Sequence, residues 1–113
     1  MTDPSSTVCV MIGNSDDKLT QAEWSKFYAH VDSLVSLYAG HVFGRWASLP
    51  HAPYQNACWA FVVGEGTGGG YRPRDVLRLA LSEVALSYRQ ESIAWVEGVP
   101  EMLKAAEPVA RRR

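Results

Sequence analysis

The chain lacks the features that mark several specialised classes of protein. It has two cysteines, Cys9 and Cys58, which are too few for a disulfide framework, so we expect reduced thiols and a cytoplasmic location. No apolar run approaches the roughly 20 residues that span a bilayer, so we expect no membrane association. The first six residues are polar and lack the basic and apolar regions of a secretory signal. A net charge of −1 supplies no field that would attract nucleic acid.

What the chain does contain is enough apolar material for one folded domain. Its 113 residues are 47% hydrophobic and 20% charged, which is typical of a globular protein and excludes wholesale disorder. We therefore expect a single domain over residues 1–113, with an ordered core over about 7–98. Five glycines between 64 and 70 predict a flexible loop, and residues 107–113 predict a C-terminal tail.

Hydrophobic periodicity predicts six elements in the order strand, helix, strand, strand, helix, strand. Thr20 and Glu23 have the spacing of a capping box, and Gly40 stands where a helix-ending glycine is expected. Pro73 suits the first turn of the second helix. The predicted strands cover 7–12, 41–46, 57–63 and 92–97, the helices cover 20–39 and 73–88, and a short helical turn covers 101–106.

This order predicts an α+β domain with a ferredoxin-like βαββαβ fold, in which a four-stranded antiparallel sheet carries both helices on one face. The other face then stays open. Because large apolar residues occupy both faces of the strands, the open face should bind a partner or a second copy. Alternation along the strands predicts one face with Val8, Val10, Ile12, Cys58, Ala60 and Val62, and an opposite face with Cys9, Met11, Trp59 and Phe61.

The third strand also invites a nucleic-acid interpretation. Residues 58–62, Cys-Trp-Ala-Phe-Val, are similar to the first ribonucleoprotein motif of RNA-recognition domains, and residues 10–14 are similar to its partner motif. The match is incomplete, since Ala57 replaces a basic residue, Gly64 replaces an aromatic residue and Met11 replaces the stacking aromatic. Single-stranded nucleic acid or nucleotide binding therefore remains an alternative.

A second motif could bind an anion. Gly64, Gly66 and Gly69 satisfy a G-x-G-x-x-G string, but the helix begins only near residue 73 and no parallel strand is expected to follow. Arg72 and Arg74 could still hold a phosphate at the helix start. The alternative is a flexible connector without a ligand.

Other candidate sites have a simpler structural interpretation. His51, Gln55, Asn56 and Cys58 are residue types of a cysteine-centred enzyme, although a cysteine in a central strand is typically inert. Residues 14–17, Asn-Ser-Asp-Asp, could ligate a hard cation but are typical of a turn. We predict no catalytic residue, no metal and no cofactor.

Three segments carry a resemblance to known proteins: Ser15–Thr20, Gln55–Trp59 and Ser92–Trp95. Over residues 12–98, the chain resembles small proteins of actinobacterial genomes and of their phages and plasmids. The resemblance implies an origin and no specific activity. It favours a small accessory protein that acts by binding a macromolecule such as a host factor or a defence component.

These observations together predict a non-catalytic binding or regulatory protein that self-associates, or docks a macromolecular partner, through an apolar sheet face. The alternatives are a nucleic-acid binder and a small cysteine-centred enzyme. Large aromatic side chains carry most interface energy, and they guide the choice of contact residues. The predicted partner-binding residues are Met11, Trp59, Phe61 and Trp95 as anchors, with Trp46 and Tyr54 at the rim.

Overall fold

The computed structural model describes residues 6–14, 18–49, 55–64 and 72–106. Four strands and two helices lie within these ranges, in the predicted order. The elements are β1 (Thr7–Gly13), α1 (Gln21–Tyr38), β2 (Ala39–Ala47), β3 (Asn56–Val63), α2 (Pro73–Ser87) and β4 (Ala94–Gly98).

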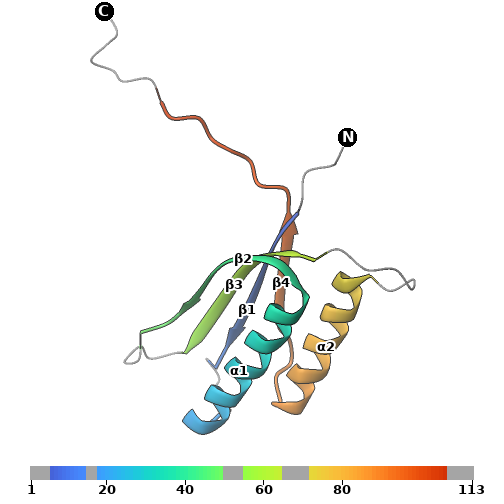
Figure 1. The fold of residues 1–113 in the computed structure, drawn as a ribbon. Coiled ribbons are helices and arrows are strands. Elements are labelled where there is room, and N and C mark those ends of the chain that lie inside the picture. The colour runs from blue at the N-terminus through green and yellow to red at the C-terminus, as the bar shows by residue number, and fades with distance from the viewer. Residues whose placement is uncertain (1–5, 15–17, 50–54, 65–71, 107–113) are drawn as a thin grey trace, which may run out of the picture.

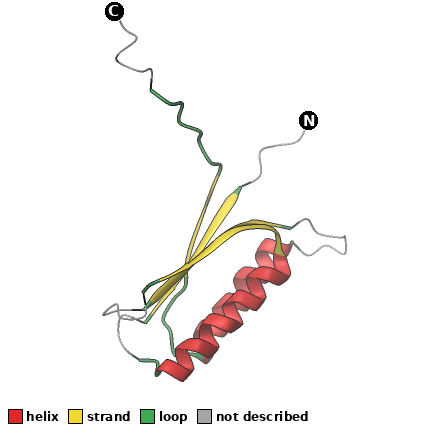
Figure 2. Ribbon diagram, turned by 60° about the vertical axis from the view of Figure 1, so that its left-hand side comes forward, coloured by secondary structure: helices red, strands yellow, loops and turns green. Residues whose placement is uncertain are grey.

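The strands form one sheet with the order β2-β3-β1-β4, and every neighbouring pair is antiparallel. Figure 1 shows α1 and α2 side by side on one face of this sheet. Figure 2 shows the sheet as one layer and the helices as a second layer. The predicted arrangement is confirmed, and neither of the two described helices covers the other broad face of the sheet.

The two ends of α1 follow different rules. At its start the predicted capping box is present: the Glu23 amide donates to Thr20 Oγ1 at 3.1 Å, and the Thr20 amide donates to Glu23 Oε1 at 3.0 Å. At its end the prediction for Gly40 is wrong, because α1 passes directly into β2 and Gly40 lies within that strand. A Cβ at Gly40 would stand 3.2 Å from the Gly64 Cα, so close approach of two backbones explains this glycine.

The chain after β4 also differs from the expectation. Residues 101–106 form no helical turn; instead, Figure 1 shows the described segment beyond β4 running away from the two layers. Met102 and Leu103 are 82% and 85% exposed there. A turn of helix in this position would gain no apolar contact to offset its entropy cost.

The turn that follows α2 contains the one non-glycine residue with a positive φ among the described residues, Arg89, at 58°. The Gln90 amide donates to the Ala85 carbonyl and the Arg89 amide donates to the Leu86 carbonyl, which is the pattern that a left-handed residue makes possible at a helix end. The Arg89 guanidinium donates to the Lys18 carbonyl at 3.0 Å and to Glu23 at 2.9 Å. These contacts connect the end of α2 to the start of α1.

The core lies between the sheet and the helices, and the strand register decides which residues enter it. In β1 and β3, Val8 is opposite Phe61 and Val10 is opposite Trp59. Opposite residues of an antiparallel pair share a face. All four side chains are fully buried against Phe27, Val31, Val35, Leu77, Leu81 and Val84 of the helices.

This register corrects the predicted faces. Trp59 and Phe61 lie on the helix-covered face with Val8 and Val10, whereas Cys58, Ala60 and Val62 lie on the open face with Cys9 and Met11. β3 is apolar on both faces, so its own alternation cannot tell which set is covered. The covered set is the bulkier one, because the space between two layers must be filled.

A polar contact holds Trp59 in the core. Its indole Nε1 donates a hydrogen bond to Asp32 Oδ1 of α1 at 2.9 Å, so the single donor of the buried ring is satisfied. Asp32 also accepts a hydrogen bond from Arg45 Nε of β2. Burial raises the pKa of Asp32, but the hydrogen bonds from Arg45 and Trp59 and the charge of Arg45 outweigh it, so the pKa lies below its ordinary value.

Candidate interaction surface

The uncovered side of the sheet is a nearly continuous apolar surface, which we call the open face. Its residues follow from the register, since Cys9 is opposite Ala60 and Val96, and Met11 is opposite Cys58 and Ala94. On the other side of β3, Trp46 of β2 is opposite Cys58. The open face consists of Cys9, Met11, Gly44, Trp46, Cys58, Ala60, Val62, Ala94 and Val96, with Thr7, His41, Asn56 and Gly98 at its ends.

No Asp, Glu, Lys or Arg belongs to the open face. The four strands contain two charged residues, Arg45 and Glu97, and both point towards the helices. Arg45 is paired with Asp32 of α1, and Glu97 is paired with Arg74 of α2 at 2.5 Å. Strand charges usually lie on the solvent side of a half-exposed sheet. Here the helices supply their counter-charges, and the open face is left uncharged.

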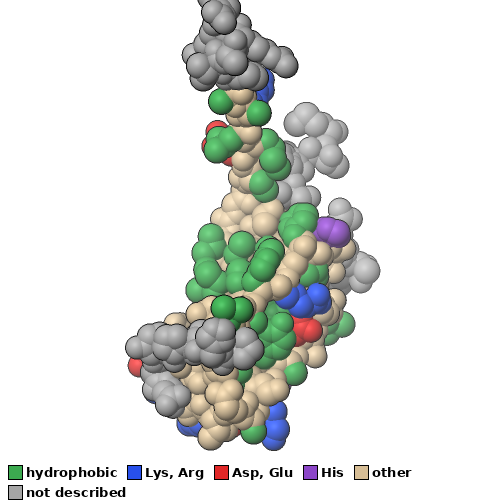
Figure 3. All heavy atoms as spheres, turned by 90° about the vertical axis from the view of Figure 1, so that its left-hand side faces the viewer, with side chains coloured by type: hydrophobic (Ala, Val, Ile, Leu, Met, Phe, Trp, Pro, Cys, Tyr) green, Lys and Arg blue, Asp and Glu red, His purple; other side chains and the backbone are tan. Residues whose placement is uncertain are grey.

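The side chains that project most from the open face are Trp46, Val96 and Met11, which are 56%, 55% and 39% exposed. Phe43 is 56% exposed at the β2 irregularity, and its ring contacts His41 at a centroid distance of 4.9 Å. Figure 3, which views the molecule from the β2 side, shows hydrophobic side chains gathered over the sheet and few charged ones among them. Such a surface favours contact with another apolar surface.

The structure separates the predicted partner-binding residues into two groups. Met11 and Trp46 lie on the open face, and their role as contact residues stays a prediction. Trp59 and Phe61 are fully buried, so their prediction as anchors is wrong. Trp95 is opposite Val10 on the helix-covered side, where it packs edge-on to Phe61, so it is not an open-face anchor either. Tyr54 lies outside the described residues.

The burial of Trp59 and Phe61 also argues against the nucleic-acid interpretation. A base can stack only on an accessible ring, and the aromatic residues of the matching motif, Trp59 and Phe61, have no exposed surface. The open face also offers no Lys or Arg to a phosphate. Among the described residues of the open face, the aromatic side chains that a base could reach are Trp46 and His41, with Phe43 adjacent to them.

The thiols do not have the properties of a catalytic site. Burial raises the pKa of Cys58, and the neighbouring Cys9 raises it further through charge repulsion and a hydrogen bond. A nucleophilic cysteine needs the opposite shift. Gln55 is occupied with Gln21 and Asn14, and His51 lies outside the described residues.

At the remaining predicted sites, some side chains already make ion pairs or hydrogen bonds within the chain, and others lie outside the described residues. Arg74 is paired with Glu97, and Arg72 precedes α2 without a side-chain cap; the glycines at 66 and 69 are not described, so the anion site stays a prediction. Buried Asn14 uses its carbonyl oxygen to accept from the Leu19 amide at 3.0 Å. Among the described residues, no three His, Cys, Asp or Glu side chains form a metal-binding group.

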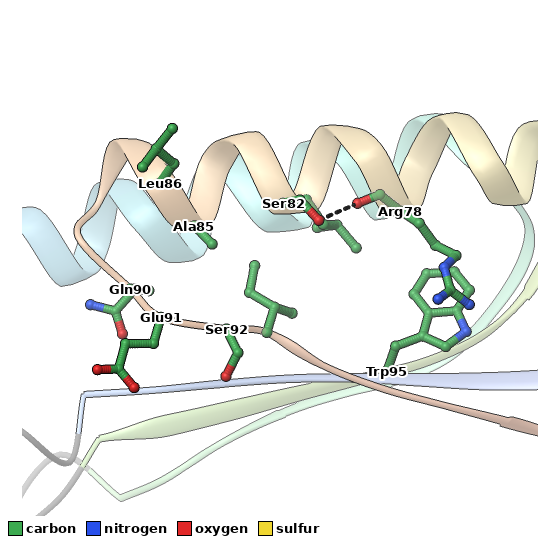
Figure 4. A pocket seen from close by; sticks show the side chains of 10 residues that line it. Arg78, Ser82, Ala85, Leu86, Gln90, Glu91, Ser92 and Trp95 are labelled. Atoms are coloured by element: carbon green, nitrogen blue, oxygen red, sulfur yellow. Dashed lines mark hydrogen bonds between the residues drawn. The ribbon is translucent and has the colours of Figure 1, made fainter.

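A groove of about 430 Å³ lies between α2 and the segment that leads into β4. Figure 4 shows Arg78 over the Trp95 ring, with its guanidinium carbon 5.2 Å from the ring centroid. Ser82 Oγ donates to the Arg78 carbonyl, and the side-chain amide Nε2 of Gln90 donates to the Tyr88 carbonyl. Ser82 and Gln90 therefore use polar groups in contacts at the groove wall. The open face is the larger apolar surface, and we take it as the candidate interaction surface.

Two solved structures are similar to this chain in fold. The C-terminal domain of the MgtC protein from Mycobacterium tuberculosis is 12% identical, with a TM-score of 0.53, over 92% of this chain and 99% of that one. The fold is ferredoxin-like. A dimeric ferredoxin-like protein from an uncultured marine organism is 7% identical over 93% and 95% of the two chains, with a TM-score of 0.37, and carries no argument. No protein-family model and no curated protein matched the sequence.

The composition of the two described helices bears on the expectation about membrane association. Neither combines the length and the apolar composition that a bilayer-crossing helix requires. Their buried apolar residues, such as Phe27 of α1 and Leu77 of α2, pack against the sheet, whereas Leu37, Leu79 and Leu86 are exposed.

Proposed function

We propose that this protein is a non-catalytic binding protein that self-associates through the open face. The observation that carries the proposal is the combination of an uncovered sheet surface, protruding Trp46, Met11 and Val96 side chains, and the absence of charge on that surface. A surface of this composition gains free energy when it leaves water, at roughly 25 cal/mol per Å² of apolar area.

A second copy of the chain is the occupant that best fits an uncharged face. In a two-fold symmetric interface each residue meets the same surface on its partner, so residues near the axis meet themselves. A charge there would face a like charge. The open face has none, because Arg45 and Glu97 are turned towards the helices. A charged partner would find no complementary group.

The size of the open face is adequate for a dimer. Four strands spaced about 4.8 Å apart and about seven residues long, rising about 3.3 Å per residue, give a projected area of about 440 Å². Two copies therefore contribute about 900 Å² before the relief of protruding side chains is counted. A specific interface needs about 1,000 Å² in total, and homodimer interfaces are more apolar than most.

Two further expectations belong to the same proposal. The protein would act in the cytoplasm, where its thiols stay reduced, and it would be an accessory protein of an actinobacterial phage or mobile element. An oligomer built on the open face would present the helices and the groove beside α2 outwards. A macromolecular partner would then dock on those surfaces.

The proposal is tested by measuring mass in solution for the purified chain and two variants. Val96→Asp places a charge in the open face at a residue that is already 55% exposed, so the monomer keeps its core. Leu79→Asp places the same charge on α2, at a residue that is 62% exposed. We expect the wild-type and Leu79→Asp proteins to be oligomeric in light scattering across a dilution series, and Val96→Asp to be monomeric.

Absorbance at 260 and 280 nm, recorded on each elution peak, separates the alternatives. A wild-type monomer would refute self-association through the open face. If that monomer carried excess 260 nm absorbance that high salt removes, nucleic-acid binding would replace our proposal, because phosphate contacts weaken steeply with salt. Dissociation by Leu79→Asp and not by Val96→Asp would move the interface to the helices.

A further inference from the structure

Three sulfur-containing side chains gather on the open face. Cys9 and Met11 are alternate residues of β1, and Cys58 stands directly opposite Met11 on β3. Side chains directly opposite each other have Cβ atoms about 4.5–5.5 Å apart, and diagonal neighbours such as Cys9 and Cys58 are about 7–8 Å apart, with their Cβ atoms somewhat closer. Both cysteines are free and half-buried. Cys58 and Met11 share one register position, and Cys9 completes a triangle with them.

The two thiols interact with each other. Cys9 raises the pKa of Cys58 through a hydrogen bond and charge repulsion, and these effects require the sulfur atoms to be close. A soft metal ion that binds such a pair replaces its protons, since metal coordination requires thiolates.

We propose that Cys9, Cys58 and Met11 form a binding site for a soft monovalent cation, Cu(I). Thiolate and thioether sulfur are the ligands that select Cu(I). Two S–H bonds break, two thiolate–Cu bonds form, and two protons leave to the solvent. The Met11 thioether adds an electron pair without losing a proton, and no atom changes its oxidation state.

Other metal ions fit these residues less well. A structural zinc site takes four protein ligands, almost always Cys or His with some carboxylates, and the described residues hold no group of three such side chains. Calcium and magnesium require oxygen ligands, and the open face has no carboxylate. Cu(I) accepts two or three sulfur ligands, which is the set that the open face supplies.

The site is complete within one chain, so it goes beyond the proposed self-association and does not depend on it. The experiment titrates the full-length, reduced protein without oxygen, using Cu(I) held by the coloured chelator bicinchoninate. We expect the protein to take one Cu(I) per chain from the chelator. Native mass spectrometry should show one bound copper with the loss of two protons.

Variants assign the ligands. Cys9→Ser and Cys58→Ser should each abolish the competition, and Met11→Leu should weaken it. Met102→Leu, at a residue 82% exposed beyond β4, should leave it unchanged. Cys9→Ala and Cys58→Ala repeat the test, and thermal melts of all variants confirm that each protein is folded.

The outcomes separate this site from the proposed function. A wild-type protein that takes no copper from the chelator, or Cys58→Ser protein that binds as wild type does, would overturn the site. One copper for every two chains would overturn a site built within one chain. Light scattering on the same samples reports self-association independently: a monomer with one copper per chain keeps the site and refutes the oligomer, and a copper-free oligomer does the reverse.

Discussion

The ring of Trp46 occupies the space that a side chain at Gly44 would need. A Cβ at position 44 would stand 3.0 Å from Trp46 Cζ2 and 3.1 Å from Cη2. The two residues lie on the same face of β2, an edge strand of the sheet. The tryptophan therefore covers a strand position that has no side chain of its own, and the glycine lets the ring lie close to the backbone.

Gly44→Ala should destabilise the protein by about 1 kcal/mol, because the added methyl group displaces the Trp46 ring from the backbone. Urea unfolding measures the loss. Gly98→Ala is the control, since a Cβ at Gly98 would meet no atom within 4 Å; its effect should stay within about 0.5 kcal/mol. In a Trp46→Ala background, Gly44→Ala should lose most of its cost. Equal costs in both backgrounds would show that the ring is not the cause.

Asp32→Ala should cost about 1–3 kcal/mol, because it leaves the buried Trp59 indole without its acceptor. Asp32→Asn should cost less, since an amide oxygen can still accept from the ring. Glu83→Ala, on the exposed side of α2, should change the free energy of unfolding by no more than about 0.5 kcal/mol. Equal losses for Asp32→Ala and Asp32→Asn would instead attribute the effect to the charge on Arg45.

Stability should fall as the pH drops below about 4. The backbone hydrogen bond at Thr20 and the contacts with Arg89 lower the pKa of Glu23, and Asp32 also has a lowered pKa. A carboxyl whose pKa is lower in the folded state contributes stability above its unfolded pKa and loses it as the pH falls through the folded value. Urea midpoints between pH 2.5 and 6 measure this. Asp32→Asn should have a shallower loss, and an unchanged slope would exclude Asp32 as a contributor.

Arg89→Ala and Arg89→Gly should differ by about 1 kcal/mol in the free energy of unfolding, with the glycine variant more stable. Both variants lose the guanidinium contacts to Lys18 and Glu23, so their difference reports the backbone alone. The φ of 58° at this position favours glycine. Equal stabilities would mean that the helix end relaxes to a negative φ when the arginine contacts are lost.

The sequence predicted the fold but not the side of the sheet on which each strand residue lies. The order of the helices and strands, the capping box and the helix periodicity each depend on local sequence patterns, and the structure confirms all three. In contrast, the covered face of β3 depends on its register with β1, which places Trp59 opposite Val10. The useful sequence feature was volume: Trp and Phe alternate with Cys and Ala in β3, and only the bulky set fills the space beneath two helices.

The uncharged open face was hidden from the sequence for a related reason. Arg45 and Glu97 suggest a solvent-facing surface when each strand is taken alone. Their counter-charges, Asp32 and Arg74, come from the helices and not from the strands themselves. Only the assembled layers show that both strand charges turn inwards, which leaves Met11 and Trp46 among neutral neighbours.

Trp59 and Trp46 lie on opposite faces of the sheet, so their alanine variants should behave in opposite ways. Trp59→Ala opens a cavity in the core and should cost about 3–5 kcal/mol in unfolding free energy, measured in urea. Trp46→Ala removes a ring that is 56% exposed; the monomer should stay folded while association weakens by about 2 kcal/mol or more, measured by light scattering on dilution. If Trp59→Ala were a stable monomer and Trp46→Ala a stable oligomer, the assignment of the two faces would be reversed.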